Sequence, residues 1–358
     1  MLLLLQDRMS EINIALFGIF SLFSALVGVP GNLIALVHFV QDKKKISSFL
    51  YRCISASDML ACLLMIPKIA TSFDPEHTGL FKNNYFCEIW NFLWKTSYKF
   101  SLFAVLMLSA VRSFYLLSPF SPRRSTLVKV ITLSYLLILA LEEILLKVFL
   151  KFVSHYDPKF GHCLWLLHLP DRADMTTMIH PFSDKFKVLV TFYWGVQVVL
   201  PMILTIISCL VTLVHMVVTN RNQETDQGNT RSKATGTILA VSLACITFNL
   251  PHSIIRILDT VSILSEYKFN WYTSLSPNTI SFLYSFLDAP VFALSAAVNP
   301  IIYMWRMKDL RVGLGSGTRW IGRKVSRSCR CRSDAEEPYF RMGERKRTSA
   351  SKTKSSKV

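Results

Sequence analysis

Long apolar stretches alternate with short polar segments along most of the chain. Seven ranges stay apolar for about 20 residues or more, the length of helix that crosses a hydrocarbon core of about 30 Å. They are residues 12–40, 47–67, 88–117, 130–150, 188–218, 235–264 and 279–304. Because each range is long enough to cross a bilayer, the pattern predicts an all-α membrane protein built as a seven-transmembrane helix bundle.

The positive charge between these ranges predicts how the helices are oriented. With the N-terminus outside, the inner loops carry 10 Lys or Arg in 39 residues, and the outer segments carry 9 in 81 residues. The inner loops are residues 41–52, 118–129 and 219–233, and the outer segments are 1–10, 68–86, 151–187 and 264–278. Since cytoplasmic loops are enriched in Lys and Arg, we expect a multi-pass plasma-membrane protein with an extracellular N-terminus and a cytoplasmic C-terminus.

Composition fits a membrane protein with a basic tail, since 51% of the 358 residues are hydrophobic and only 18% are charged. The tail after Tyr303 adds 16 Lys or Arg residues to a chain of net charge +17. On the cytoplasmic side such a tail faces the lipid bilayer, so no nucleic-acid partner is expected. Cys329 and Cys331 lie among these basic residues, where a palmitoyl chain and a polybasic patch would anchor the tail. The alternative is an unmodified, solvated tail.

The eight cysteines differ in the environment that the topology gives them. Four lie in or beside apolar spans, where small buried thiols are common: Cys53, Cys62, Cys209 and Cys245. Only Cys87 and Cys163 face the oxidising exterior, the first at the start of the third span and the second in the longest outer loop. A disulfide between Cys87 and Cys163 is therefore the one oxidised pair that the topology allows.

Polar residues and prolines within the spans are informative because such groups are costly in lipid. In chain order they are Asn32 in VPGNLIAL, Asp58 in SASDML, Arg112, Pro201, Pro251 in FNLPHSII, and Asn299, Pro300 and Tyr303 in AAVNPIIY. In this order, on these spans, the chain resembles the rhodopsin-like (class A) G-protein-coupled receptors over about residues 12–312. The most specific motif is Asn299-Pro300-x-x-Tyr303, followed by MWRMKDLRVGL, which is similar to the family's short amphipathic eighth helix.

The resemblance implies four parts of the chain. They are a short extracellular N-terminus (1–11), the seven-helix transmembrane domain (12–304), the amphipathic eighth helix (305–314) and a disordered basic cytoplasmic tail (315–358). It also implies an extracellular ligand and a heterotrimeric G protein as partners, with arrestin as a further partner. No enzymatic activity is expected, because the sequence shows no inverted repeat and no cluster of paired intramembrane catalytic groups.

The resemblance assigns G-protein coupling and switching to five residues: Arg112, Pro251, Asn299, Pro300 and Tyr303. In the family the arginine meets the G protein when the sixth helix swings outward. A proline removes a backbone hydrogen bond from a helix, so Pro201, Pro251 and Pro300 are expected to mark bends. Such bends give the inner end of a helix bundle a way to open.

Asp58 is a lone carboxylate within the second span. By resemblance it holds an allosteric sodium ion together with Ser97, Ser101, Ser295 and Asn299, and such oxygen ligands suit a hard cation. The alternative is a protonated Asp58 that is hydrogen-bonded to Asn299 without an ion. No other metal or cofactor is expected.

Three departures from the family pattern bear on signalling. Relatives flank the arginine as Asp-Arg-Tyr, whereas this chain reads Val111-Arg112-Ser113; Asn249 replaces a Trp before the sixth-span proline, and the fourth span lacks its usual Trp. Because the acidic neighbour that holds the arginine at rest is missing, we expect ligand-independent signalling unless other contacts replace it. The alternative function is an atypical non-signalling receptor-like protein, a scavenger or an arrestin-type adaptor.

The expected ligand cavity is mixed in character. Its residues are Trp94, Lys95, Tyr98, Lys99, Asn249, His252 and Arg256, with Asp259 and Asp288 nearer the mouth. Amine receptors place an Asp where Trp94 stands, and opsins carry a Lys in the seventh span, which here has none, so neither class is expected. Lys95 and Arg256 are candidates to capture a carboxylate, which favours a peptide or a small anionic molecule. Lys99 has an alternative role in which Glu142 or Glu143 neutralises it.

Overall fold

The structure is a computed structural model of the chain, and nine stretches of it can be described. They are residues 18–41, 46–73, 84–117, 125–150, 152–157, 162–167, 195–220, 226–265 and 290–307. The expected N-terminal segment 1–11, all but the first residues of the eighth helix, and the tail 315–358 lie outside the described residues. The expected division of the chain into these parts therefore stays a prediction.

Each apolar range contains a helix within its described part. The helical elements are η1 (Ser24–Gly28), α2 (Val29–Gln41), α3 (Ile46–Phe73), α4 (Asn84–Leu117), α5 (Ser125–Leu150), η4 (Gly195–Val199), α7 (Leu200–Asn220), α8 (Asp226–Leu264) and α10 (Pro290–Arg306). The elements η1 and η4 are short π-helical turns that run directly into α2 and α7. Over the described residues, five helical spans are long and apolar enough to cross a membrane: Gly18–Gln41, Ile46–Pro67, Tyr85–Leu117, Gly195–Val218 and Thr235–Ser262.

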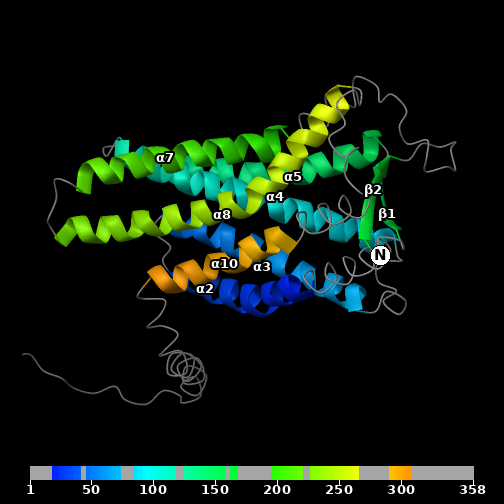
Figure 1. Cartoon of the computed structure of the whole chain (residues 1–358), viewed down its shortest axis with the longest axis horizontal. Helices are drawn as coiled ribbons and strands as arrows, with labels where there is room; N and C mark the ends of the chain where they lie inside the picture. The colour runs from blue at the N-terminus through cyan, green and yellow to red at the C-terminus, as the bar shows by residue number, and fades with distance from the viewer. Residues whose placement is uncertain are drawn as a thin grey trace, which may run out of the picture. The chain divides into compact units, whose positions relative to one another are not determined.

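Helix α4 is the element around which much of the bundle packs. It contacts α3, α5, α7 and α8, and these helices run side by side in Figure 1. Leu102, Val105 and Leu108 of α4 are each 1% exposed and belong to one apolar core. Because residues three apart lie on one face of a helix, this spacing turns a continuous apolar face of α4 toward its neighbours.

Helices α5 and α7 turn other apolar side chains away from the protein. Leu133 and Leu137 of α5 are exposed, as are Leu210 and Val214 of α7. An outward apolar face is expected where lipid tails are the solvent, since a bilayer imposes no cost on exposed hydrocarbon. Both faces therefore fit a protein that is embedded in a membrane.

Helix α10 approaches η1 and α2 closely because two glycines stand at the contact. A Cβ atom on Gly31 would lie 2.8 Å from Cβ of Pro300, and one on Gly28 would lie 3.1 Å from Cβ of Ala297. The amide nitrogen Nδ2 of Asn32 donates hydrogen bonds to the carbonyls of Gly28, at 2.9 Å, and Ala296, at 3.0 Å. Small residues thus bring the backbones together, and one amide fastens them.

The three prolines that the sequence predicts to mark bends lie in helices α7, α8 and α10. Pro251 is inside α8 and Pro300 is inside α10, and α8 changes direction along its length in Figure 1. Pro201 follows the π-helical turn η4 as the second residue of α7. The Thr205 hydroxyl donates to the Pro201 carbonyl at 2.7 Å, a local bond that often accompanies a bent helix.

A short β-hairpin follows α5, in the range expected to be an outer loop. Strands β1 (Phe152–Asp157) and β2 (His162–Leu167) pair antiparallel, with Tyr156 opposite Cys163. The hairpin contacts α4 and α5, and it lies beside the end of α5 in Figure 1. The apolar pattern did not predict these strands, because it identified only stretches long enough to span a bilayer.

The contact between Gly31 and Pro300 leads to a stability prediction. We expect Gly31→Ala to lower the free energy of unfolding by about 1 to 3 kcal/mol, because the added methyl overpacks a tight helix contact. Thermal unfolding of the purified protein in detergent measures the change. Gly195→Ala is the matched control, since no atom lies within 4 Å of a Cβ at that position. A melting temperature that is the same for both variants would contradict the close-packing interpretation.

Candidate functional site

Many of the residues predicted for function lie along helix α4. Trp94 and Arg112 stand 18 residues apart on this helix, which at 1.5 Å per residue separates them by about 27 Å. Between them lie Lys99 and Ser101, each of which contacts a carboxylate on another helix. One helix therefore carries an aromatic cluster near its Cys87 end, a buried carboxylate in its middle and an arginine near its other end.

The aromatic cluster consists of Trp90, Trp94, Tyr98, His252 and Phe292. The rings of Trp90 and Trp94 stack at 5.7 Å, and Phe292 meets Trp94 at 5.4 Å and Tyr98 at 4.7 Å, edge to face. His252 meets Tyr98 at 5.4 Å. Because residues four apart share a helix face, the three α4 rings form one stripe that joins α4 to α8 and α10.

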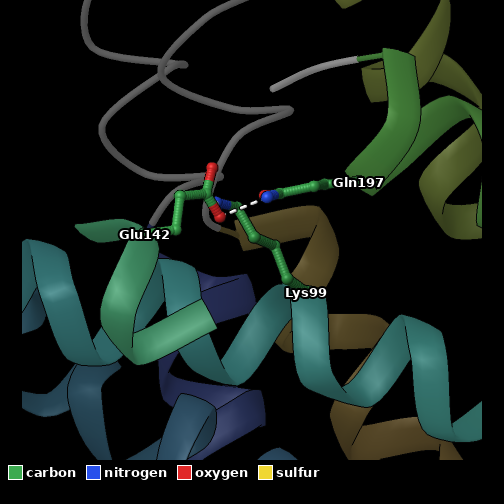
Figure 2. Close-up of polar contacts among 3 residues, drawn as sticks. All are labelled: Lys99, Glu142 and Gln197. Carbon is green, nitrogen blue, oxygen red and sulfur yellow. Dashed lines mark hydrogen bonds and ion pairs between the residues drawn. The ribbon is translucent and has the colours of Figure 1, made fainter. Parts of the chain in front are cut away.

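Lys99 lies on another face of α4, where it meets a carboxylate. Its ammonium lies 3.7 Å from Oε2 of Glu142 on α5, and the Gln197 amide of η4 donates a hydrogen bond to the same oxygen (Figure 2). Lys99 is 2% exposed, Gln197 4% and Glu142 16%. The structure thus contains an ion pair between Lys99 and Glu142, while the side chain of Glu143 lies outside the described residues.

The remaining residues of the expected ligand cavity differ in their surroundings. Asn249 is buried and donates through Nδ2 to the Cys245 carbonyl of its own helix at 2.8 Å. Lys95 and Arg256 are half-buried, on the stretches of α4 and α8 that carry the aromatic cluster. The side chain of Asp259 and all of Asp288 lie outside the described residues. Of the predicted set, Tyr98 and His252 therefore meet directly, Trp94 is linked to Tyr98 through the ring of Phe292, and Asn249 bonds within α8.

The middle of the bundle contains the buried carboxylate of Asp58, which is fully shielded from solvent. Its Oδ1 accepts a hydrogen bond from the Ser101 hydroxyl at 2.6 Å, and its Oδ2 accepts one from Nδ2 of Asn299 at 2.6 Å. Asp58 belongs to α3, Ser101 to α4 and Asn299 to α10. The carboxylate therefore joins three helices at one point.

The donor set around Asp58 suits a hard cation. The carbonyl oxygen Oδ1 of Asn299 is buried without a hydrogen-bond partner among the described residues, so an acceptor oxygen remains to be satisfied. Ser97 and Ser295 are buried one helical turn from Ser101 and Asn299, and all five side chains offer oxygen, which Na⁺ prefers to nitrogen or sulfur. Within the described part of the chain, no group of three His, Cys, Asp or Glu side chains could hold a metal ion.

At the far end of α4, Arg112 contacts α8. Its guanidinium donates a hydrogen bond to the Thr235 hydroxyl. The next residue, Ser113, donates to the Ser208 carbonyl at 2.9 Å and lies 3.0 Å from the Thr212 hydroxyl, both on α7. This end of α4 is thus fastened to α7 and α8 by neutral partners, with Val111 where relatives carry an acid.

Tyr303 of α10 is fully buried among rings of α2 and α3. It meets Phe39 at 5.5 Å and Tyr51 at 5.3 Å, both edge to face, and those two rings stack at 4.7 Å. The Tyr303 side chain therefore fixes the end of α10 against α2 and α3.

Several contact residues were not predicted from the sequence, and three of them join the sites described above. Thr235 holds Arg112, Gln197 bonds Glu142 and Phe292 joins the aromatic cluster. Gln197 stood out only as a single amide in an apolar run, a signal that marks buried polar contacts in membrane helices. Thr235 and Phe292 have no such signal, because threonine and phenylalanine are ordinary residues in a membrane span.

The predicted disulfide is partly visible. Cys87 is buried and disulfide-bonded, whereas Cys53, Cys62, Cys209 and Cys245 are free. Cys163 lies in β2, but its side chain is outside the described set. The pairing of Cys87 with Cys163 therefore stays a prediction, and the contact between the hairpin and α4 is compatible with it.

The order of these sites along the chain agrees with a comparison with protein families. Residues 31–303 match the family model of the seven-transmembrane receptors of the rhodopsin family. The chain therefore belongs to the rhodopsin family of seven-transmembrane receptors, and it is a multi-pass membrane protein. Among individual curated proteins, no match is found.

The disulfide prediction can be tested by peptide mapping. We expect non-reducing digestion of protein from the cell surface to yield one linked peptide that contains Cys87 and Cys163, since an oxidised sulfur on Cys87 requires a second cysteine. Mass spectrometry before and after reduction identifies the pair. Recovery of Cys163 as a free thiol would contradict the pairing, and the free thiol of Cys53 serves as the internal control.

Proposed function

We propose that the chain is a ligand-activated receptor that catalyses nucleotide exchange on a heterotrimeric G protein. The observation that carries the proposal is the hydrogen bond from Arg112 to Thr235, because it ties α4 to the helix whose outward swing opens a G-protein site in this family. Tyr303 and the Asp58 carboxylate connect α10 to α2, α3 and α4. A ligand that moves α8 or α10 at one end can therefore act on the other.

The proposal includes the orientation of the chain in the membrane. The N-terminus and the Cys87 end of α4 face outside, whereas Arg112, the eighth helix 305–314 and the basic tail face the cytoplasm. Palmitoylation of Cys329 and Cys331 and phosphorylation of the tail would then act on the same side as the G protein and arrestin. The Lys and Arg densities of the loops support this direction.

The proposed ligand is a peptide or a small anionic molecule. The aromatic cluster supplies ring surface, and half-buried Lys95 and Arg256 supply positive charge on the same stretches of α4 and α8. An anionic group gains most from such cations where water is scarce. Aromatic rings beside cations form a site that favours an amphipathic anion over an amine.

Thr235 is proposed as the resting restraint of Arg112. A threonine hydroxyl bonds the guanidinium without bearing charge, and a hydrogen bond to a charged group is worth about 1.5 to 3 kcal/mol. An acidic neighbour at residue 111 would add an ion pair of up to about 1 kcal/mol. The resting state is therefore held more weakly than in relatives with both contacts, and some ligand-independent activity is expected.

Basal G-protein activation tests the proposal. We expect Thr235→Val to raise basal output several-fold, up to about tenfold, because it removes only the hydroxyl. Val111→Asp should lower the output and Arg112→Ala should abolish it. The measurement is nucleotide exchange or second-messenger output at equal surface expression. Thr237→Val, a change at a buried threonine two residues from Thr235, is the matched control and should leave output near that of the parent.

Basal output that is equal for the parent and all variants, and no higher than in cells without the receptor, would exclude G-protein coupling. That result would favour the second candidate, a scavenger or arrestin-type adaptor that does not signal. The observation behind that candidate is Val111, which stands where relatives place the aspartate of the coupling motif. Ligand-independent recruitment of arrestin in the same cells would then distinguish an adaptor from a scavenger.

The carboxylate centre is proposed as an allosteric sodium site. Asp58, Ser97, Ser101, Ser295 and Asn299 would hold the ion, which would supply a positive charge between α3, α4 and α10. The unpaired Asn299 oxygen supports an ion or water at this point. The alternative, a protonated Asp58 without an ion, needs no further ligand beyond Ser101 and Asn299.

Sodium dependence of stability separates these two states. We expect the melting temperature of the parent to rise when N-methylglucamine chloride is replaced by NaCl at constant ionic strength, because an ion that binds only the folded state stabilises it. Asp58→Asn should lose this response, while Ser24→Ala, a buried serine of η1, should retain it. A response that is equal in the parent and in Asp58→Asn would indicate the protonated acid.

A further inference from the structure

A charged cluster, formed by Lys99, Glu142 and Gln197, lies apart from the residues assigned to switching. It joins α4, α5 and η4, and none of its members contacts Asp58 or Arg112 in a bond described above. Two opposite charges inside a membrane bundle are costly to bury and are commonly functional. A mere structural link is less expected, since replacing a buried ion pair by apolar residues is often neutral or stabilising.

The charged groups of Lys99 and Glu142 are farther apart than in a close ion pair. The ammonium and Oε2 of Glu142 are 3.7 Å apart, whereas a charge-assisted hydrogen bond between such groups measures about 2.7 to 2.9 Å. The Gln197 amide already donates to that oxygen. Glu142 is also the more exposed partner, at 16% against 2% for Lys99. The carboxylate can therefore leave the pair more readily than the ammonium can.

Gln197 adds an unmet acceptor beside the charges. Its Oε1 is buried without a hydrogen-bond partner among the described residues, and the side chain is 4% exposed. The amide points toward Lys99 and Glu142 in Figure 2. A buried carbonyl oxygen without a donor is unfavourable, so a group that brings an N–H to it is favoured.

We propose that Lys99, Glu142 and Gln197 form an anion-exchange subsite, in which Glu142 is the resident anion and a ligand carboxylate takes its place on Lys99. The group that fits is a carboxylate with an N–H beside it, as in an N-acylated amino acid or at the C-terminus of a peptide. The carboxylate meets the Lys99 ammonium and the Gln197 N–H, and the N–H meets the Gln197 carbonyl oxygen. This proposal rests on the proposed receptor function, because it assigns one group of the extracellular ligand.

Exchange has a structural consequence for the helices. When Glu142 leaves Lys99, α5 loses its charged contact with α4, while Gln197 keeps η4 next to Lys99 through the ligand. A tethered carboxylate has a high effective concentration at its own partner, so a free carboxylate alone displaces it weakly. A ligand that also binds the aromatic cluster gains the additional affinity needed for exchange.

Chemical rescue with acetate tests the subsite without a known ligand. Glu142→Ala removes the atoms of one acetate and leaves Lys99 without its carboxylate. We expect sodium acetate, compared with NaCl at equal ionic strength, to raise the melting temperature of the purified full-length variant by about 3 °C at ten times the dissociation constant. The response should saturate with concentration, and the parent should respond less.

Two variants control for effects outside the subsite. Lys99→Met/Glu142→Ala lacks the cation and should show no acetate response. Glu88→Ala, a change at a half-buried glutamate of α4, should show none either. N-acetylglycine should raise the melting temperature of Glu142→Ala at lower concentration than acetate, and Gln197→Leu/Glu142→Ala should remove that difference.

The outcomes decide the proposal. No acetate response in Glu142→Ala, or one of equal size in the variant that lacks Lys99, overturns the subsite. If Glu142→Ala does not fold, Glu142→Ser and Lys99→Met/Glu142→Ser, which also leave room for acetate, are compared in the same way and by the same criteria. The readout involves no G protein, so its failure leaves the nucleotide-exchange test of Arg112 unaffected.

Discussion

A hydrogen-bonding group in the middle of a bilayer has no water, so its partner must come from the protein itself. In this receptor that requirement determines which helices meet. The Asp58 carboxylate reaches Ser101 on α4 and Asn299 on α10, and the Asn32 amide reaches a carbonyl of α10. Helices α2, α3, α4 and α10 are therefore positioned by polar bonds, and apolar packing such as that of Leu102 fills the space between them.

The same requirement explains why Asn249 and His252, both on α8, make different kinds of contact. Asn249 stands where relatives have a tryptophan, and its amide is satisfied by the preceding turn of α8, so it adds little to the contact between helices. The ring contact with α4 is made instead by His252, which meets Tyr98. Near the proline of α8, a histidine and a tyrosine thus provide the ring contact between the two helices.

The sequence predicted the helices well, because an apolar range of membrane length is a local property of the chain. It also identified Asp58, Arg112 and Asn299, since polar residues in such ranges stand out individually. Their partners depend on how each helix is rotated about its axis, which no local pattern records. Thr235 and Phe292 were missed for that reason, and Gln197 was not connected to Glu142 although it was the one amide in its span. The hairpin was missed because strands of six residues resemble any short apolar segment of a loop.

The π-helical turn η4 sets the direction in which Gln197 points. A π turn holds one residue more than an α turn, so a side chain within it points in a different direction than it would in a regular α-helix. Conversion of this turn to α geometry would carry the amide of Gln197 away from Glu142 and toward a different neighbour, without moving α7. The geometry of this turn thus sets the rotation of the side chains at the start of α7. The insertion or loss of one residue between Gly195 and Val199 would change which helix those side chains contact.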